Sequence, residues 1–181
     1  RPVAEILRQW SSLHPEFSYL PRKFKIAITG APHDRAAIRF HDIGLQAAVN
    51  AAGEIGWEVW VGGGLGRTPM IAKLINSFVP NEHLLAYLES IMRVYNRYGR
   101  RDNKYKARIK ILVHEEGLES IKGQVEAEFA EVRGGVLTLP SEEVDRISAY
   151  FALPDFAPQS LTKIDVAYES IVDPAYGRWL D

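Results

Sequence analysis

Hydrophobic residues recur at two different spacings along the chain, and the spacing predicts which segments are strands and which are helices. Apolar residues alternate with polar or small ones over residues 24–30, 43–51 and 57–64, which is typical of strands. Turn glycines between the last two runs predict that these two strands form a hairpin. Apolar residues recur every three to four positions in the segments that we expect to be helical: 3–13, 80–99, 105–113, 117–132 and 141–151.

Residue types at the ends of these segments predict where the helices begin and end. Pro15 follows the first helical segment and is expected to end it. Pro80 and Asn81 suit the first turn and the N-cap of the long helix, and Gly99 suits its end. Ser141 is expected to cap the last helical segment.

The order of the predicted elements indicates an α+β fold, a small mixed or antiparallel sheet covered by helices. We expect three regions: an N-terminal helical lead-in over 1–17, the main domain over 18–135, and a helix with an extended linker over 136–181. The linker, which could also be a docking arm, is predicted from prolines in the last thirty residues. These are Pro154, Pro158 and Pro174.

Two lysines in the stretch "LPRKFKIAITG" (20–30) are expected to share one face of the first strand. Lys23 and Lys25 are two residues apart, which places side chains roughly 6–7 Å apart on one face of a strand. Two ammonium groups at that separation repel each other, so an anion between them would stabilise the arrangement. The alternative is a pair of solvated lysines whose stems pack and whose charged ends lie in water.

The remainder of the lysine face is made of small or amide residues. Ala27 and Thr29 follow the lysines at the same period, and Gln46, Ala48 and Asn50 alternate along the next predicted strand. Such a face suits a large, flat, anionic ligand. A sheet face that is half exposed to water would have the same composition.

Two further segments suit an anion. The glycine loop over 62–69 follows a predicted strand, and its glycines would let backbone N–H groups approach an anion closely. Its sequence matches neither a Walker loop nor a dinucleotide fingerprint, and a flexible turn is the alternative. The stretch 97–110 holds seven basic residues, which would suit a carboxylate-rich cofactor, an acidic protein or nucleic acid, or form a solvated surface.

Composition narrows these options. The chain has 181 residues, a formal net charge of −1 and no cysteine, so disulfides, thiolate catalysis and thiolate metal sites are excluded for this chain by itself. The five histidines are scattered, and we assign no metal ligand. No apolar run suggests a membrane span, and the near-neutral charge argues against nucleic acid as the partner. The composition fits a cytoplasmic protein.

Five motifs, taken in order, resemble the siroheme-containing nitrite and sulfite reductases. They are "LPRKFKIAITG", "HDIGLQA", "VWVGGGLGRTP", "FVP" and "YGRRDNKYKARIKILV". Their order and spacing are similar to those in the first of the two siroheme-domain repeats of those hemoproteins. The resemblance covers residues 18–130. The resemblance implies a siroheme bridged through a cysteine to a [4Fe–4S] cluster. It also implies six-electron reduction of sulfite to sulfide, or of nitrite to ammonia.

The resemblance also implies roles for particular residues. Lys23 and Lys25 match the lysines that point at the substrate anion in the family. The nitrite-reducing members typically have Asn at the position of Lys25, so the resemblance favours sulfite, with nitrite as the alternative. Siroheme carries eight carboxylates, and the residues expected to contact this cofactor are Arg22, Gln46, Asn50, Gly62, Gly63, Gly64, Arg67, Arg101 and Lys104.

The chain departs from the family in one respect that matters. The cluster cysteines of the family lie in the second repeat, and this chain has none. We therefore expect a piece of a longer protein, inactive and without cofactor by itself, whose partners are the rest of the polypeptide and an electron donor, either ferredoxin or an NADPH flavoprotein. A non-catalytic module that binds an anion or nucleic acid on the same scaffold is the alternative from another class.

Overall fold

The computed structural model describes residues 1–155 and 163–180. The chain divides into two compact units, Arg1–Tyr150 and Phe151–Asp181. The first unit contains a sheet and five α-helices, and the second contains two short helices.

A four-stranded mixed sheet forms the centre of the first unit. Its strands are β1 (Ile26–Thr29), β2 (Ile43–Val49), β3 (Ile55–Val61) and β4 (Lys73–Pro80), in the spatial order β1-β2-β3-β4. β1 pairs with β2 in parallel, and the other pairs are antiparallel. The α+β class, the mixed sheet and the hairpin of β2 and β3 are therefore confirmed.

The sheet differs from the sequence prediction at two places. β1 begins at Ile26, so Lys23 and Lys25 precede the strand; the Lys25 N–H donates to the side chain of Asp42 and not to a neighbouring strand. β4 was not predicted at all. Two register shifts in the pairing of β3 with β4 interrupt the alternation that would have revealed it.

The five predicted helices are present with shifted ends. They are α1 (Pro2–Ser12), α2 (Leu84–Tyr98), α3 (Ile109–Glu116), α4 (Leu118–Val132) and α5 (Ser141–Ala149). Short 3-10 helices, η1 (Pro15–Tyr19), η2 (Ile38–Phe40) and η3 (Asn81–His83), lie between them.

Both N-cap predictions are wrong, whereas Gly99 ends α2 as its C-cap, as predicted. α2 starts at Leu84 because Pro80 ends β4, and the Asn81 Oδ1 accepts a hydrogen bond from Trp57 Nε1 at 2.9 Å instead of capping a helix. The N-cap position of α5 is Pro140, and the Ser141 side chain makes no capping hydrogen bond.

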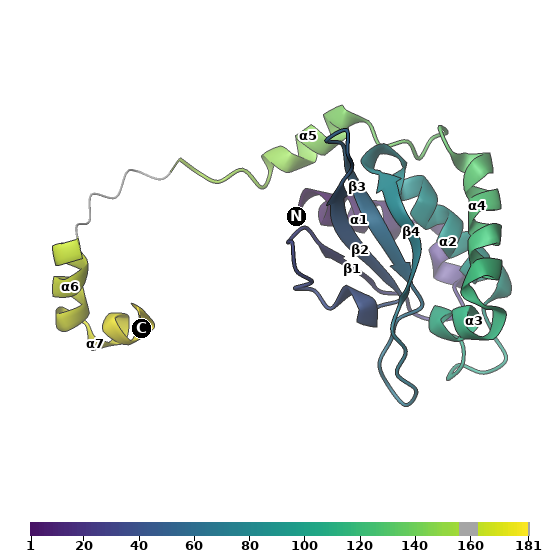
Figure 1. Cartoon of the computed structure of the whole chain (residues 1–181), viewed down its shortest axis with the longest axis horizontal. Helices are drawn as coiled ribbons and strands as arrows, with labels where there is room; N and C mark the ends of the chain where they lie inside the picture. Colours follow the sequence, from purple (N-terminus) through teal and green to yellow (C-terminus); the bar gives the residue numbers. More distant parts are fainter. Residues whose placement is uncertain (156–162, 181) are drawn as a thin grey trace. The chain divides into compact units, whose positions relative to one another are not determined.

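The core lies between one face of the sheet and the helices. Ile43 and Leu45 of β2 and Val59 and Val61 of β3 point into it, and α2 buries most of its residues against them and against α4. Figure 1 shows α1 and α2 behind the sheet, while no α-helix of residues 1–150 crosses the face turned toward the reader. The sheet thus has one face covered by α-helices and a second face, called the open face below, that carries only η2 at one end. A Cβ at Gly44 on this second face would lie 2.5 Å from the Ile38 carbonyl oxygen of η2.

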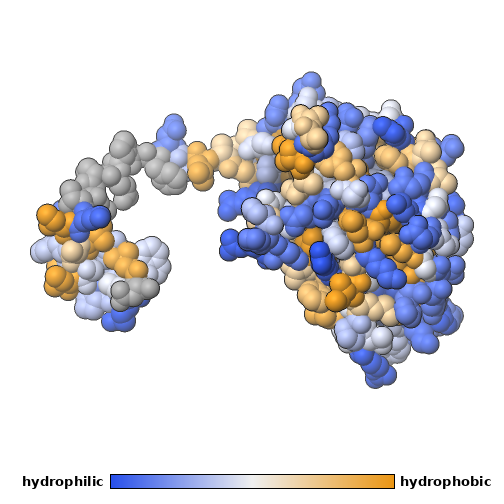
Figure 2. All heavy atoms as spheres, in the orientation of Figure 1, coloured by the Kyte–Doolittle hydropathy of each residue, from blue (hydrophilic) through white to orange (hydrophobic). Residues whose placement is uncertain are grey.

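The second unit is helical. α6 (Lys163–Val172) and α7 (Pro174–Leu180) occupy a region where the prolines predicted an extended chain, so that prediction is wrong for these residues. Pro158 lies outside the described residues. Figure 2 shows apolar residues at the surface of this unit, and Ile164, Ile171 and Trp179 are among the exposed ones. No helix in the described ranges is long and apolar enough to cross a membrane.

Candidate functional site: the lysine segment and the glycine loop

The sheet register brings the lysine segment (residues 22–25) and the glycine loop (residues 62–69) to the same end of the sheet. Ile26 at the start of β1 pairs with Ile43, and Ile43 pairs with Val61 at the end of β3. Residues directly before β1, before β2 and after β3 are therefore neighbours. Two segments that the sequence marked separately as anion sites thus lie on either side of Asp42.

A buried carboxylate joins these segments. The Asp42 side chain is inaccessible to solvent, and its Oδ2 accepts the Lys25 N–H at 3.0 Å. Arg108 donates to both oxygens of the same carboxylate, from Nε at 2.9 Å and from Nη2 at 2.8 Å. The Asp42 carbonyl accepts the Gly62 N–H at 3.0 Å. Burial raises the pKa of Asp42, and the Arg108 guanidinium opposes that shift.

The lysine segment has further backbone anchors. Arg22 donates from Nη1 to the Lys104 carbonyl at 2.9 Å, and the buried hydroxyl of Tyr95 lies 3.5 Å from the Arg22 carbonyl. Tyr95 also donates to the Ala107 carbonyl at 2.8 Å. Burial, followed by the nearby Asp42 charge, raises the pKa of Tyr95 to about 12. These contacts, together with that of Asp42, fix the backbone of the lysine segment.

The charged ends of the two lysines are in a different situation. Lys23 and Lys25 are both exposed, and neither forms an ion pair within the described part of the chain. Two cations that are two residues apart in the chain therefore have no carboxylate that would neutralise them. This arrangement suits an anion that arrives from solvent.

The glycine loop is closed by its own backbone and by Lys110. Gly64 and Met70 exchange two hydrogen bonds of 2.9 Å, and the Lys110 Nζ donates to the carbonyls of Leu65 at 3.3 Å and Thr68 at 2.5 Å. Burial, followed by the neighbouring Arg108 charge, lowers the pKa of Lys110. The Gly64 N–H is thus used inside the fold, as the Gly62 N–H is.

Close packing explains two of the glycines better than an anion cradle does. A Cβ at Gly63 would lie 2.4 Å from the Arg39 carbonyl oxygen, and a Cβ at Gly64 would lie 3.0 Å from the Lys110 stem. These residues allow the loop to approach η2 and the basic segment. Arg67, at the tip of the loop, is exposed.

Most arginines of the basic stretch 97–110 are used within the protein. Arg97 pairs with Glu128, and Arg100 pairs with Asp102. Arg101 donates to the carbonyls of Tyr19 and Asn96, each at 2.8 Å, so it anchors η1 to the end of α2. Lys104 and Lys106 remain exposed, and the Lys104 ammonium lies 5.3 Å from the centre of the Tyr105 ring.

The open face of the sheet has the small residues predicted for it. The pairs Ala27–Gly44, Thr29–Gln46 and Ala48–Gly56 place these residues on one face, and this prediction is confirmed. Glu58 lies opposite Gln46 on the same face. A carboxylate at that position disfavours a polyanion over the middle of the sheet.

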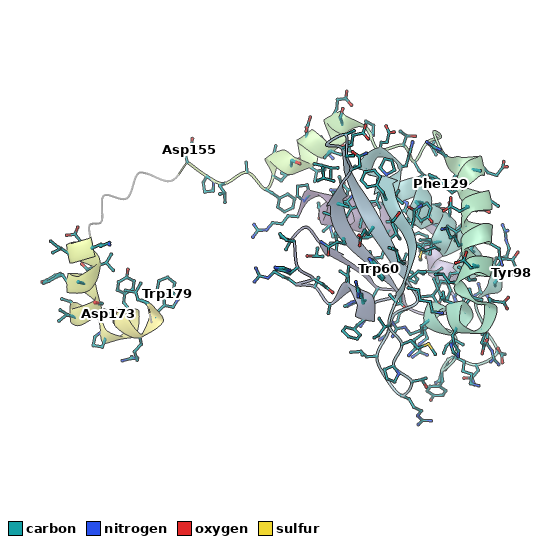
Figure 3. The ribbon with its side chains drawn as sticks, in the orientation of Figure 1. Trp60, Tyr98, Phe129, Asp155, Asp173 and Trp179 are labelled. Atoms are coloured by element: carbon teal, nitrogen blue, oxygen red, sulfur yellow. The ribbon has the colours of Figure 1, made fainter. Side chains whose placement is uncertain are left out.

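The structure does not bring every candidate residue to the lysine end. The Gln46 Nε2 donates to the Ala31 carbonyl at 2.7 Å, midway along β2 on the open face. Trp60, labelled in Figure 3, pairs with Gly44 nearer the lysine end and stacks under the Arg39 guanidinium at 4.1 Å. Asn50 follows the far end of β2, where its Oδ1 accepts the backbone N–H groups of Ala52 and Glu54 and shapes the turn.

A cavity of about 620 Å³ adjoins the lysine segment between α1, η1 and β1. Apolar residues that line it include Leu7, Phe17, Leu20, Phe24, Ile26 and Ile28. Phe24, Ile26 and Ile28 thus share one side, as the alternation predicted. Lys23 lies at this cavity too.

Sequence reasoning missed the residues that organise the site. Asp42 and Arg108 are 66 positions apart, so no local pattern connects them. Asp42 follows a histidine in a short polar segment, which suggested only a local turn. Arg108 and Lys110 lie in a run of basic residues and did not stand out from it. The available signal was that these two cations are two residues apart and flank the apolar Ile109.

Comparison with known proteins identifies the scaffold. The model of the family described as "Nitrite and sulphite reductase 4Fe-4S domain" matches residues 1–132. The chain is 40% identical to the sulfite reductase [ferredoxin] of Synechococcus elongatus in an alignment 139 residues long, which covers 71% of this chain and 22% of that protein. It is 36% identical to the sulfite reductase [NADPH] hemoprotein beta-component of Bordetella petrii, over 60% of this chain and 20% of that protein.

A solved structure has the same fold. The structure of the Mycobacterium tuberculosis NirA protein superposes with a TM-score of 0.63 and 29% sequence identity, over 72% of this chain and 23% of that one. The chain thus spans about a fifth of the length of the curated relatives it matches. Because the family model covers more than two thirds of the chain, the chain belongs to the nitrite and sulphite reductase 4Fe-4S domain family.

Proposed function

We propose that this chain is one half of the siroheme-binding core of a sulfite reductase that reduces sulfite to sulfide. The observation behind this proposal is the pair of exposed lysines without a carboxylate partner, in a segment whose backbone is bonded at Lys25 to Asp42, which also binds Arg108 and the start of the glycine loop. The relatives named sulfite reductases support the reaction class. The sequence resemblance assigned the same two lysines to the substrate anion.

Lys23 and Lys25 would act on the oxyanion directly. Their positive charges would bind sulfite and offset the negative charge that grows on its oxygens as electrons are added. Each oxygen leaves as water, so protons must reach it, and an ammonium group within hydrogen-bond reach is suited to deliver one. Siroheme and its iron–sulfur cluster, when bound, supply the electrons.

The residues at the lysine end fit a cofactor that carries carboxylates. Arg22, Arg67 and Lys104 are cations near the lysine segment or the glycine loop, and they are our proposed contacts to siroheme together with residues 62–64. The cluster does not fit this chain, because iron–sulfur clusters are held by cysteine thiolates and the sequence has no cysteine. Its ligands must come from another part of the enzyme, and we expect the isolated chain to be inactive.

Sulfite is preferred over nitrite because of Lys25. The resemblance assigns an asparagine to this position in nitrite-reducing members. A second cation suits sulfite, which exists partly as a dianion at neutral pH, better than nitrite, which carries one charge. Ferredoxin and NADPH systems are both named among the relatives, so either could be the electron donor.

A module that binds nucleic acid has less support, since Arg97, Arg100 and Arg101 already bind groups within the protein.

Lys25→Asn in the complete reductase tests the proposal. We expect the kcat/KM for sulfite to fall about tenfold or more, since one charge-assisted contact to the oxyanion is lost, and the value for nitrite to fall less. Steady-state turnover with each anion and a common artificial electron donor gives both values. Lys106→Asn, at an exposed lysine of the basic stretch, is the matched control and should change neither. Equal losses for the two anions would contradict the role of Lys25 in choosing sulfite.

A further inference from the structure

The proposed chemistry leaves the buried carboxylate behind the lysine segment unexplained. Asp42 is inaccessible to solvent, so its charge is transferred out of water at a cost of several kcal/mol. A buried ion pair gives little net stability compared with an apolar pair of the same shape. Stability is therefore a poor reason for an aspartate at this position, and its geometry suggests another.

Two polar atoms of Asp42 bind the two segments that border the anion site. The Oδ2 atom accepts the N–H of Lys25, and the carbonyl accepts the N–H of Gly62. The next residue, Ile43, donates its N–H to the Lys25 carbonyl at 3.1 Å. The backbone of Lys25 is thus held through both its N–H and its carbonyl by two successive residues.

Arg108 fixes the carboxylate in turn. Its two-point contact leaves Asp42 little rotational freedom, because a planar guanidinium and a carboxylate match in only a few geometries. Two residues later, Lys110 binds the carbonyls of the glycine loop. One short segment, residues 108–110, therefore fixes both walls of the site, the lysine wall through Asp42 and the loop wall directly.

We propose that Asp42 and Arg108 are positioning residues that set the place of the Lys25 ammonium relative to the glycine loop and thereby the affinity for the oxyanion. This inference rests on the proposed function, since it assumes that Lys25 binds the substrate. Neither residue touches the anion itself. Loss of the pair would release the backbone of Lys25 and let its side chain drift from the anion.

Asp42→Asn in the complete reductase, with its siroheme and cluster bound, tests this role. The asparagine keeps the shape, but its NH2 group would face the Arg108 guanidinium, so the two-point contact is lost. We expect the dissociation constant of sulfite, read from the siroheme absorbance, to rise about tenfold, because a displacement of about 1 Å is enough to weaken such a contact. Siroheme content should stay unchanged.

Glu89→Gln is the matched control. Glu89 is also a buried carboxylate bound to an arginine, Arg93, but it lies on α2 and contacts no residue of the lysine segment. A general loss of stability would appear in both variants as a lower unfolding temperature. A positioning role predicts that only Asp42→Asn weakens sulfite binding when both are measured well below their unfolding temperatures.

Arg108→Lys provides a second variant if Asp42→Asn does not fold. It retains the positive charge and replaces two hydrogen bonds by one, so we expect a rise of about threefold to tenfold in the same dissociation constant. Unchanged sulfite binding in either folded variant would overturn the positioning role. If Lys25→Asn also leaves sulfite binding unchanged, the proposed function fails with it; if Lys25→Asn weakens binding, only the positioning role fails.

Discussion

At the residue scale, the described part of the protein buries two carboxylates, each bound to an arginine, in separate places. One is Asp42, which pairs with Arg108 behind the lysine segment. The other is Glu89 on α2, which lies 3.0 Å from the His14 Nε2 and 3.1 Å from the Arg93 Nε. His14 stacks on Phe17 at 4.0 Å between ring centres, so this second cluster links η1 and the end of α1 to α2. Both carboxylates therefore join segments that are distant in sequence.

The second cluster leads to a prediction about pH. Burial raises the pKa of Glu89 above its usual 4.5, and the His14 and Arg93 charges only partly offset this shift. The folded state then binds more protons than the unfolded state at pH values just above 4.5, so the contribution of Glu89 to stability falls as pH rises through that range. We expect the wild type to lose stability relative to Glu89→Gln between pH 4.5 and the raised pKa.

Urea denaturation of both proteins at closely spaced pH values measures this difference. The free energy of unfolding of the wild type minus that of Glu89→Gln should decrease with pH. A difference that grows with pH would mean that the ion pairs outweigh burial and that the pKa is lowered. Glu143→Gln is a useful control, because the Glu143 carboxylate is exposed on α5 and its pKa is lowered by Arg146, which predicts the opposite trend.

At the element scale, the strands and helices that could be predicted from sequence are those in which the spacing of apolar residues stays constant along the whole element. β2 and β3 alternate regularly over seven residues each, and α2 has a continuous apolar stripe, so these were predicted. β4 pairs with β3 through two register shifts and has Asn76 and Ser77 at its middle, so its pattern resembles a loop. The ends of elements were predicted less well, because tertiary contacts such as that of Asn81 decide them.

The contact of Asn81 with Trp57 can be tested by a double-mutant cycle. The Trp57 indole is buried, and its Nε1 donates to the Asn81 Oδ1 at 2.9 Å, which ties β3 to η3 at the entrance of α2. Asn81→Ala leaves this N–H unpaired, so we expect a loss of about 1–2 kcal/mol in the free energy of unfolding. In a Trp57→Phe background, where no N–H remains, the same change should cost about 0.5 kcal/mol or less. Equal costs in both backgrounds would show that this contact adds nothing.

The site shows the same dependence on tertiary contacts. Lys23 and Lys25 stand two residues apart in a motif, so they could be marked from sequence alone. Asp42 and Arg108 meet only because the sheet register and the start of α3 bring them together, which one sequence does not reveal. Arg101 resembled a cofactor ligand, yet its guanidinium binds the carbonyls of Tyr19 and Asn96. The sequence shows which segments are charged. The folded structure shows which of these charged side chains have no partner inside the protein and can bind a ligand.

At the scale of the whole molecule, the packed unit continues beyond the region that matches the family. The family model ends at residue 132, while the first compact unit ends at Tyr150. Leu139 and Ile147 are buried in this unit, and the Leu139 N–H donates to the Glu82 carbonyl at 2.9 Å. α5 also contacts α1. Residues 133–150 are thus part of the core of the first unit.

Two truncations test this boundary. A chain of residues 1–150 should unfold at the same urea concentration as the chain of 1–181, because the second unit is compact by itself. A chain of residues 1–132 should lose about 3 kcal/mol or more in the free energy of unfolding, since burial of each large apolar side chain contributes about 1.5–3 kcal/mol and both Leu139 and Ile147 are removed. Ile147→Ala in the chain of 1–150 separates packing from length and should account for about 2–4 kcal/mol. If the chains of 1–132 and 1–150 unfold at the same urea concentration, α5 is not part of the core, and the boundary of the folded unit coincides with the family match.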